Sequence, residues 1–376
     1  MRRINLLVLA LLLCAACTGG TAPAPSPSVP APTPPAPSAA PLRLDVVAAA
    51  TGPAAADDRS YLDGMRLAVE DVNAAGGVAG RPVELRVTDT GGEPERGQEV
   101  LRSIEEGRPV ATLFVGPGPT VAEARASIVA AGNPVFLLGG DLYTSGRLFD
   151  QVFQTSIPWE WQAHVIARYL VRDRKAKDVV FVGSGPEAAR AATATADAMS
   201  YWGGHLARSY VGAAPPGSLP ATAEQADAAV VFGSPGDSAA IVRSLTSSGP
   251  GPRVAGGQSL LADSEAPPPG TTACYTYTWA GWAEPIPRVG RFIHHVTQAF
   301  GHPPVGFGQE GYDAVRVLAL ALERTEGRGG NALVTALETT HKTFSSFPVD
   351  LGPDDHLFLP RDELGLFAVP GPTEKL

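Results

Sequence analysis

The sequence predicts an α/β fold made of two lobes, each a doubly wound parallel sheet, joined by hinge crossovers. From Arg43 onward, short apolar runs rich in β-branched residues alternate with segments whose apolar positions recur at three- and four-residue steps. This alternation occurs in two series, separated by the apolar and aromatic stretch 157–161. A chain of 376 residues, 44% of them hydrophobic, is long enough to bury two cores.

The first series begins with a strand over 44–49 and a helix over 61–75. In that helix Leu62, Met65, Val69 and Val72 would share one face, and the glycines at 76 and 77 would end it. The series then continues with strands over 83–87, 110–115 and 135–138 and helices over 98–106 and 121–131.

The second series follows the same pattern, and the late helices are expected to return to the first lobe. It comprises helices over 162–171, 187–202 and 238–246, strands over 179–182, 229–232 and 254–255, an aromatic run over 274–279, and late helices over 288–300 and 311–324. The expected organisation is a first lobe over 43–158, a second over 159–282, a return to the first over 283–345, and a C-terminal segment over 346–376 that closes onto the second.

The first 42 residues have the features of an export signal and a tether. Two arginines precede an apolar run over 6–13 that is too short to span a bilayer. Ala15-Ala16-Cys17 resembles a bacterial lipobox, in which the cysteine sulfur receives fatty-acyl chains such as palmitate; the alternative is an ordinary secretory signal cut after Ala16. The resemblance predicts a signal peptide over 1–16, a lipidated Cys17, and a proline-rich linker reaching residue 42, on the extracytoplasmic face of the bacterial cell membrane.

Charge and cysteine content argue against several classes of protein. The net charge is −9 with acids and bases interspersed, whereas a nucleic-acid partner requires a basic surface. Cys14, Cys17 and Cys274 match no zinc or redox spacing, so we expect no metal site.

An enzyme is not expected either. Residues 183–188 match the GxGxxA dinucleotide fingerprint, but no acid lies between Asp197 and Glu224, where the ribose-binding carboxylate belongs. The sequence contains no HExxH, GxSxG or phosphate-loop motif. We therefore predict no catalytic residues and no cofactor.

Four short loops follow predicted strands and are rich in Gly, Ser, Pro and Thr, at 116–120, 139–141, 183–186 and 233–236. Ligands of open α/β sheets bind at the carboxyl ends of the strands, and backbone N–H groups exposed there suit an anionic group. The candidate ligand-binding residues in these loops are Gly118, Pro119, Thr120, Gly140, Asp141, Ser184, Gly185, Ser234 and Pro235.

The segment 61–85, YLDGMRLAVEDVNAAGGVAGRPVEL, resembles the first helix and second strand of the branched-chain amino acid ABC-transporter binding proteins. These form the leucine-binding family of type I periplasmic binding proteins. The segment 311–315, GYDAV, agrees with that family, and the resemblance extends over about 43–370. It implies a two-lobed receptor that closes on a small-molecule solute and delivers it to an ABC permease in the membrane.

The family's binding residues transfer only in part. The resemblance places the solute carboxylate at 117–120 and 139–141, where Thr120 alone offers a comparable hydroxyl. An aromatic residue of the family falls at about Asp57, its second-lobe tyrosines fall near Glu187 and Pro235, and its ammonium-binding acid falls at about Gln258.

Two alternatives follow from these departures. Either Asp57 or Asp141 provides the negative charge for a solute ammonium, because a desolvated ammonium without a partner is costly, or the solute is not a standard α-amino acid. A neutral Gln258 with Tyr275, Tyr277 and Trp279 suits an amide, a sugar-like or an aromatic solute. A degenerate binding fold that serves as an envelope sensor or protein-interaction module is the alternative function.

Overall fold

The computed structural model describes residues 40–107, 109–142, 151–212, 223, 225–247, 251–261, 271–276, 287–302, 304, 307–345, 348–359 and 364–369. All of them belong to one compact unit, residues 36–376. Cys17, Tyr277 and Trp279 lie outside the described residues, and so does the segment expected to form the signal peptide.

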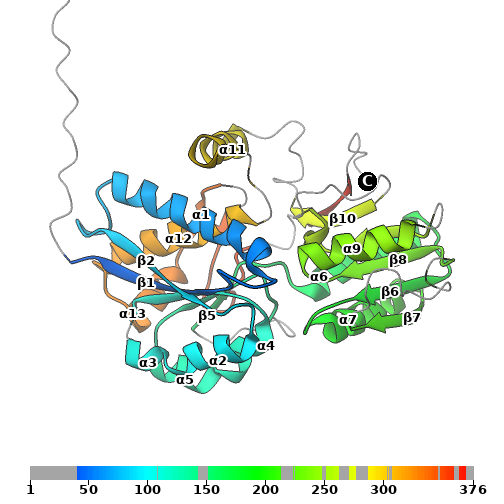
Figure 1. Ribbon diagram of the computed structural model, residues 1–376, viewed down its shortest axis with the longest axis horizontal. Coiled ribbons are helices and arrows are strands. Elements are labelled where there is room, and N and C mark those ends of the chain that lie inside the picture. Colours follow the sequence, from blue (N-terminus) through cyan, green and yellow to red (C-terminus); the bar gives the residue numbers. More distant parts are fainter. Residues whose placement is uncertain are drawn as a thin grey trace, which may run out of the picture. The chain divides into compact units, whose positions relative to one another are not determined.

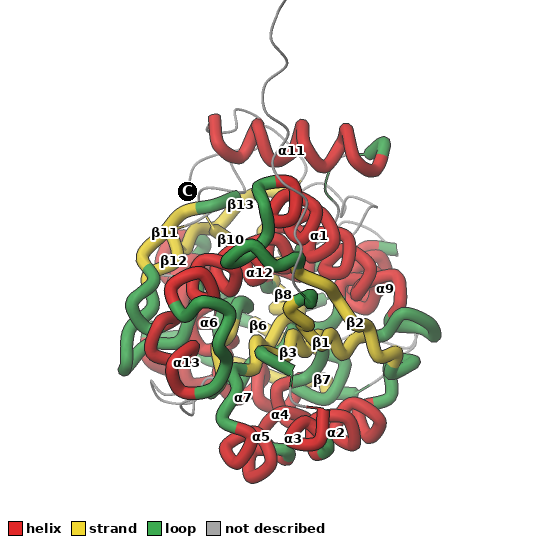
Figure 2. Tube along the Cα trace, turned by 90° about the vertical axis from the view of Figure 1, so that its left-hand side faces the viewer, coloured by secondary structure: helices red, strands yellow, loops and turns green. Residues whose placement is uncertain are grey.

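The first sheet has the strand order β2-β1-β3-β4-β5, and all its pairs are parallel. Helices α1 and α12 lie on one side of it and α2 to α5 on the other (Figures 1 and 2). The strands are β1 (Leu42–Ala48), β2 (Val83–Asp89), β3 (Ala111–Val115), β4 (Val135–Leu138) and β5 (Val152–Gln154). The helices are α1 (Ala55–Ala74), α2 (Pro94–Arg102), α3 (Ile104–Gly107), α4 (Gly118–Glu123), α5 (Arg125–Ala131) and α12 (Gly308–Arg324), with α13 (Asn331–Leu337) against α12.

Both faces of this sheet are buried, which explains why its strands are continuous apolar runs. On β3, Leu113 and Val115 belong to the core shared with α1 and α12, whereas Phe114 packs with Leu101 and Ile128 under α2 and α5. Successive side chains of a strand point to opposite faces, so a strand covered on both sides must be apolar at every position.

The second sheet has the order β13-β10-β9-β8-β6-β7, and its pairs are parallel except β13 with β10. Its strands are β6 (Val179–Gly183), β7 (Leu206–Val211), β8 (Ala228–Phe232), β9 (Arg253–Gly256), β10 (Thr271–Thr276) and β13 (Leu364–Val369). The covering helices are α6 (Trp159–Arg168), continued by a π-helical turn (Tyr169–Asp173), α7 (Ala188–Tyr201) and α9 (Pro235–Thr246). Phe181 shares a core cluster with Ile166 of α6, whereas Val180 packs with Val242 of α9.

These two sheets confirm the α/β class with two parallel-stranded lobes. The remaining described elements are a 3-10 turn (Gln258–Leu261), α11 (Pro287–Phe300), β11 (His341–Thr343) and β12 (Pro348–Asp350). The C-terminal segment contacts both sheets, because Leu357 forms a bridge with Gln154 of β5 and β13 pairs with β10.

Several elements differ from expectation, among them the helix expected over 98–106, which is divided into α2 and α3. Helix α1 begins at Ala55 rather than at Tyr61, because its first turns are polar and carry no apolar periodicity. The helix expected over 121–131 is divided at Ala124 into α4 and α5. Strand β7 was not expected, since this edge strand is half-exposed and its sequence, LARSYV, is not an apolar run.

Helices α1 and α12 approach closely through glycine. A Cβ added at Gly64 would lie 1.9 Å from the carbonyl oxygen of Gly308, and one at Gly311 would lie 2.3 Å from the oxygen of Tyr61. No larger side chain fits either position without moving a helix. This contact fixes α1 and therefore the residues of its first turns.

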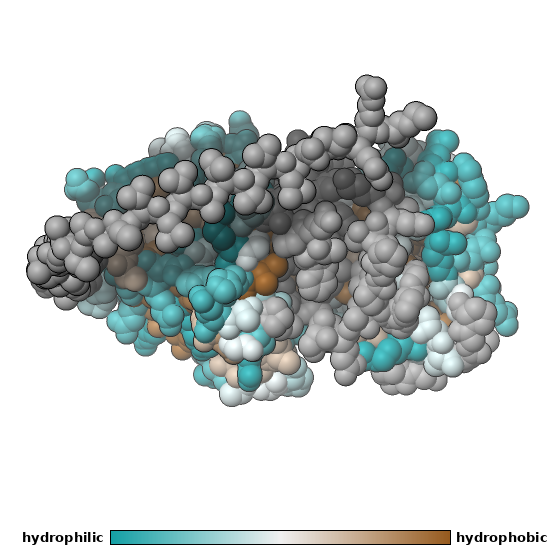
Figure 3. All heavy atoms as spheres, turned by 90° about the horizontal axis from the view of Figure 1, so that it is seen from above, coloured by the Kyte–Doolittle hydropathy of each residue, from teal (hydrophilic) through white to brown (hydrophobic). Residues whose placement is uncertain are grey.

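The described surface visible in Figure 3 is mainly hydrophilic. Among the described residues, the large hydrophobic side chains that are exposed are few, namely Val87, Val129, Tyr201 and Val211. None of the described helices combines the length and the apolarity needed to cross a bilayer.

Candidate ligand-binding site

Loops that follow strands of both sheets line a single cavity of about 460 Å³. The first sheet contributes 115–117 at the end of β3 and Gly139 after β4, and the second contributes 184–188 after β6 and 232–235 at the end of β8. A cavity of this volume, at the carboxyl ends of parallel strands, is of the size that small-molecule sites have.

Aromatic side chains form much of the apolar wall. Tyr61 and Phe307 pack with their ring centroids 5.7 Å apart, and Trp159 meets Phe232 edge-on at 4.9 Å. Such rings provide large apolar area and an electron-rich face.

The charged residues of the described lining are all acidic: Asp57, Asp58, Glu93, Glu187 and Asp237. No Lys, Arg or His occurs among the described lining residues. Burial raises the pKa of Asp58 to about 7, and the neighbouring Asp57 adds to the rise. The described lining therefore carries no positive charge to balance its acids.

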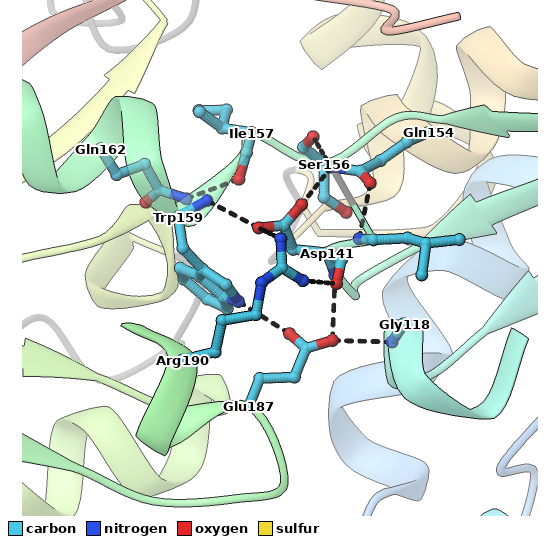
Figure 4. Close-up of polar contacts among 10 residues, drawn as sticks. Gly118, Asp141, Gln154, Ser156, Ile157, Trp159, Gln162, Glu187 and Arg190 are labelled. Carbon is cyan, nitrogen blue, oxygen red and sulfur yellow. Dashed lines mark hydrogen bonds and ion pairs between the residues drawn. The ribbon is translucent and has the colours of Figure 1, made fainter. Parts of the chain in front are cut away.

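Glu187 links the two lobes (Figure 4). It stands immediately before α7 of the second lobe, yet its Oε1 accepts hydrogen bonds from the backbone N–H of Gly118 at 2.7 Å and of Asp141 at 3.0 Å. Its Oε2 accepts from Nε1 of Trp159 at 2.8 Å. Burial raises the pKa of this carboxyl to about 7. The carboxylate of Glu187 thus accepts hydrogen bonds from two first-lobe N–H groups that were expected to bind a solute.

Asp141 is not among the residues that line the cavity. Its side chain is 1% exposed and accepts hydrogen bonds from Nε2 of Gln154 at 2.9 Å and from the backbone N–H of Trp159 at 2.9 Å. Arg190 completes the shell, with Nη2 at 3.3 Å from Oδ2 of Asp141 and Nη1 donating to its carbonyl at 2.6 Å. Of the two acids considered as partners of a solute ammonium, the cavity lining therefore contains only Asp57.

The other candidates divide between the lining and the structure behind it. The lining includes Asp57, Ser184, Gly185, Ser234, Pro235 and Gln258. It does not include Gly118, Pro119, Thr120 or Gly140, because the loops after β3 and β4 pack on one another: a Cβ on Gly118 would lie 2.2 Å from the oxygen of Asp141. Tyr275 lies in β10, and its side chain is outside the described set.

Gln258 is the most notable polar group of the lining. Its side chain is almost wholly buried, at 5% exposure, and Oε1 has no hydrogen-bond partner among the described residues. Its backbone N–H is held by Oε1 of Gln162 at 2.8 Å, so the residue is fixed in place. A buried acceptor without a donor costs free energy unless a bound molecule supplies one.

The sequence did not identify four aromatic residues of the lining, Tyr61, Trp159, Phe232 and Phe307. It identified Glu187 only as a position near which the family has a tyrosine. Phe232 is the last residue of a buried strand and Glu187 follows another, so the rule that ligands bind where parallel strands end could have found them. Trp159 begins α6 and Phe307 immediately precedes α12. Neither lies in a loop that follows a strand of the sheets' cavity edge, so no local sequence pattern predicts that they line the cavity.

This geometry defines a two-lobed solute-binding protein, and the chain belongs to the periplasmic binding protein family, whose model matches residues 41–359. Membership confirms the resemblance given by the segment 61–85 and implies a solute receptor that acts outside the cytoplasm.

Two curated relatives support this assignment over part of the chain. A Leu/Ile/Val-binding protein homologue of Brucella melitensis is 32% identical over 148 residues, and the protein BraC3 of Rhizobium johnstonii is 30% identical over 148 residues. The matched part is 38% of this chain and 39% of each relative, so the similarity spans well under half of their length.

Solved structures share the fold over most of the chain. A type 1 periplasmic binding protein of Bordetella pertussis superposes with a TM-score of 0.76 at 16% identity, covering 89% of this chain and all of its own. The substrate-binding protein LivJ of Streptococcus pneumoniae, solved with isoleucine, gives 0.73 at 18% identity, with 89% and 99% covered. A Rhodopseudomonas palustris solute-binding protein, solved with 3,4-dihydroxybenzoic acid, gives 0.72 at 17% identity, with 87% and 92% covered.

Proposed function

We propose that the protein is the extracytoplasmic solute receptor of an ABC transporter, which binds a small amino-acid-like or amide solute between its lobes by hinge closure. The observation that carries the proposal is the cavity of about 460 Å³ whose lining comes from strand ends of both sheets. A solute in that position contacts both lobes, so its binding energy favours the closed arrangement. Leucine-type and aromatic ligands named for the similar proteins are compatible with the aromatic wall.

A thermal-shift screen of the mature chain against amino acids, amides and sugars tests this proposal. A solute that binds only the folded protein stabilises it by about 2.7 kcal/mol at a hundredfold excess over Kd. Because Trp159 lines the cavity, its fluorescence gives an independent titration. The proposal fails if no solute moves either signal.

We also propose that Cys17 is lipidated and that 17–42 tether the receptor to the outer face of the membrane, beside an ABC permease. Support comes from the lipobox-like Ala15-Ala16-Cys17 and the proline-rich linker. Cys17→Ser is expected to release the protein from the membrane fraction, and retention of that variant would refute the anchor.

The alternative is a degenerate receptor that has become an envelope sensor or protein-interaction module. It is favoured by Glu187, because this side chain accepts the hydrogen bonds of two first-lobe N–H groups that a solute carboxylate would otherwise accept. A screen without any bound solute, combined with specific capture of a protein partner, would support this alternative.

A further inference from the structure

We infer that the solute is a cation without a carboxylate, such as a primary amine or guanidine, recognised by the acidic and aromatic lining and by the unpaired carbonyl of Gln258. This inference rests on the proposed receptor function, and it narrows the amino-acid-like solute of that proposal to one that carries the cationic group of an amino acid but no carboxylate.

The cavity lining is rich in hydrogen-bond acceptors. Besides Asp57, Asp58, Glu93 and Asp237, it holds the buried Oε1 of Gln258, which lacks a donor among the described residues. A protonated amine carries up to three N–H donors and a positive charge, so it satisfies a carbonyl and neutralises a carboxylate at once.

Three donors in the loops where a carboxylate was expected to bind are already engaged within the protein. The N–H groups of Gly118 and Asp141 converge on Oε1 of Glu187, and the hydroxyl of Ser184 donates to Oδ2 of Asp237 at 2.8 Å. A solute carboxylate that used the N–H groups of Gly118 and Asp141 would have to displace Glu187 and would then lie beside it, where like charges repel. Glu187 thus acts as a specificity-determining residue against α-amino acids.

The walls suit a cation as well. Tyr61, Trp159, Phe232 and Phe307 present ring surface to the cavity, and cations are attracted to aromatic faces in desolvated sites. Burial raises the pKa of both Asp58 and Glu187 to about 7, which marks acids that have no cation beside them in the described lining. A bound cation would compensate that cost.

The test compares amines with the amino acids that differ from them only by a carboxylate. The pairs are isopentylamine with leucine, phenethylamine with phenylalanine, cadaverine with lysine, and agmatine with arginine, each titrated calorimetrically into the mature chain at pH 8. We expect at least one amine to bind with a Kd about tenfold or more below that of its amino acid. Tighter binding of the amino acids would overturn the inference while leaving the receptor function in place, whereas no binding of any amine, amino acid, amide or sugar would count against both.

Variants separate recognition from folding. Asp57→Asn is expected to weaken the best amine about tenfold, whereas the matched control Asp63→Asn, also on α1 but outside the cavity lining, should leave its Kd unchanged. Glu187→Ala should raise the affinity for the paired amino acid relative to the amine, because it frees two N–H groups; if that variant does not fold, Glu187→Gln removes the negative charge that would repel a solute carboxylate and should shift the two affinities in the same direction. An unchanged ratio of the two affinities would refute the role of Glu187.

Discussion

The substitution Glu187→Gln tests whether the buried carboxyl group that connects the two lobes makes the stability of the protein depend on pH. The wild-type carboxylate accepts three hydrogen bonds, from Gly118, Asp141 and the indole of Trp159, in a site where its side chain is withdrawn from water. Glutamine keeps the shape and cannot ionise; its carbonyl oxygen can still accept from Gly118 and Asp141, but its NH2 group then faces the indole N–H of Trp159, which is also a donor. The substitution therefore removes the titration and one of the three hydrogen bonds, and this pH-independent loss does not affect the comparison between pH values.

The expected change in the free energy of unfolding with pH follows from the pKa of Glu187, which burial raises from 4.5 to about 7. An acid whose pKa is higher in the folded state binds more protons there than in the unfolded chain between these two values. The free energy of unfolding therefore falls as the pH rises through that window, and the loss is complete above about pH 7. The difference between the two pKa values corresponds to about 3 kcal/mol.

Urea unfolding of both proteins at pH 4.5, 6 and 8 measures this effect. The wild type should lose about 3 kcal/mol more than Glu187→Gln between the first and last pH. Burial also raises the pKa of Asp58 and Glu310, to about 7 and about 8, but both acids are present in the two proteins and cancel in the comparison. Glu84→Gln, at an exposed position of β2, is the control that should follow the wild type. Parallel curves for wild type and Glu187→Gln would refute the reasoning.

Three further predictions concern stability and reactivity. Asp141→Asn removes the charge of a buried carboxylate that is paired with the partly exposed Arg190 and should cost about 1–3 kcal/mol of unfolding free energy in urea melts, so an unchanged midpoint would contradict its structural role. Gly64→Ala should lower the melting temperature sharply because the new Cβ would lie 1.9 Å from the oxygen of Gly308, whereas Gly236→Ala, with open space around it, should stay within about 1 kcal/mol of the wild type. Burial raises the pKa of the Cys274 thiol, so a thiol-specific dye should label it only after denaturation; rapid labelling of the native protein would show that this part of β10 opens.

The fold could be predicted because its strands carry a strong signal. β3, β4, β6 and β8 are buried on both faces, so each is apolar at almost every position and stands out from the polar turns around it. The edge strand β7 and the first turns of α1 carried no such signal, because they are half-exposed and polar. The glycine loops after the strands were likewise readable, since tight turns at strand ends need that residue type.

The candidate site was only partly predictable. Ser184 and Ser234 lie in loops that follow strands, and the rule about strand ends led to them, whereas Gln258 was found only through the family resemblance. Asp141 lies in such a loop as well, but the packing of Gly118 on that loop and the ion pair with Arg190 keep it out of the lining.

The sequence by itself determined the class of fold, the family through the segment 61–85, and the loops in which a ligand site should lie. Only the tertiary structure decided that Glu187 reaches from one lobe to the N–H groups of Gly118 and Asp141 in the other, and that the charged residues of the described lining are acids. The physical reason is that periodicity reports which residues share a face within one element. Glu187 is separated from Asp141 by 46 residues of sequence and from Gly118 by 69. Contacts over such separations are determined by the packing of whole sheets and helices against each other.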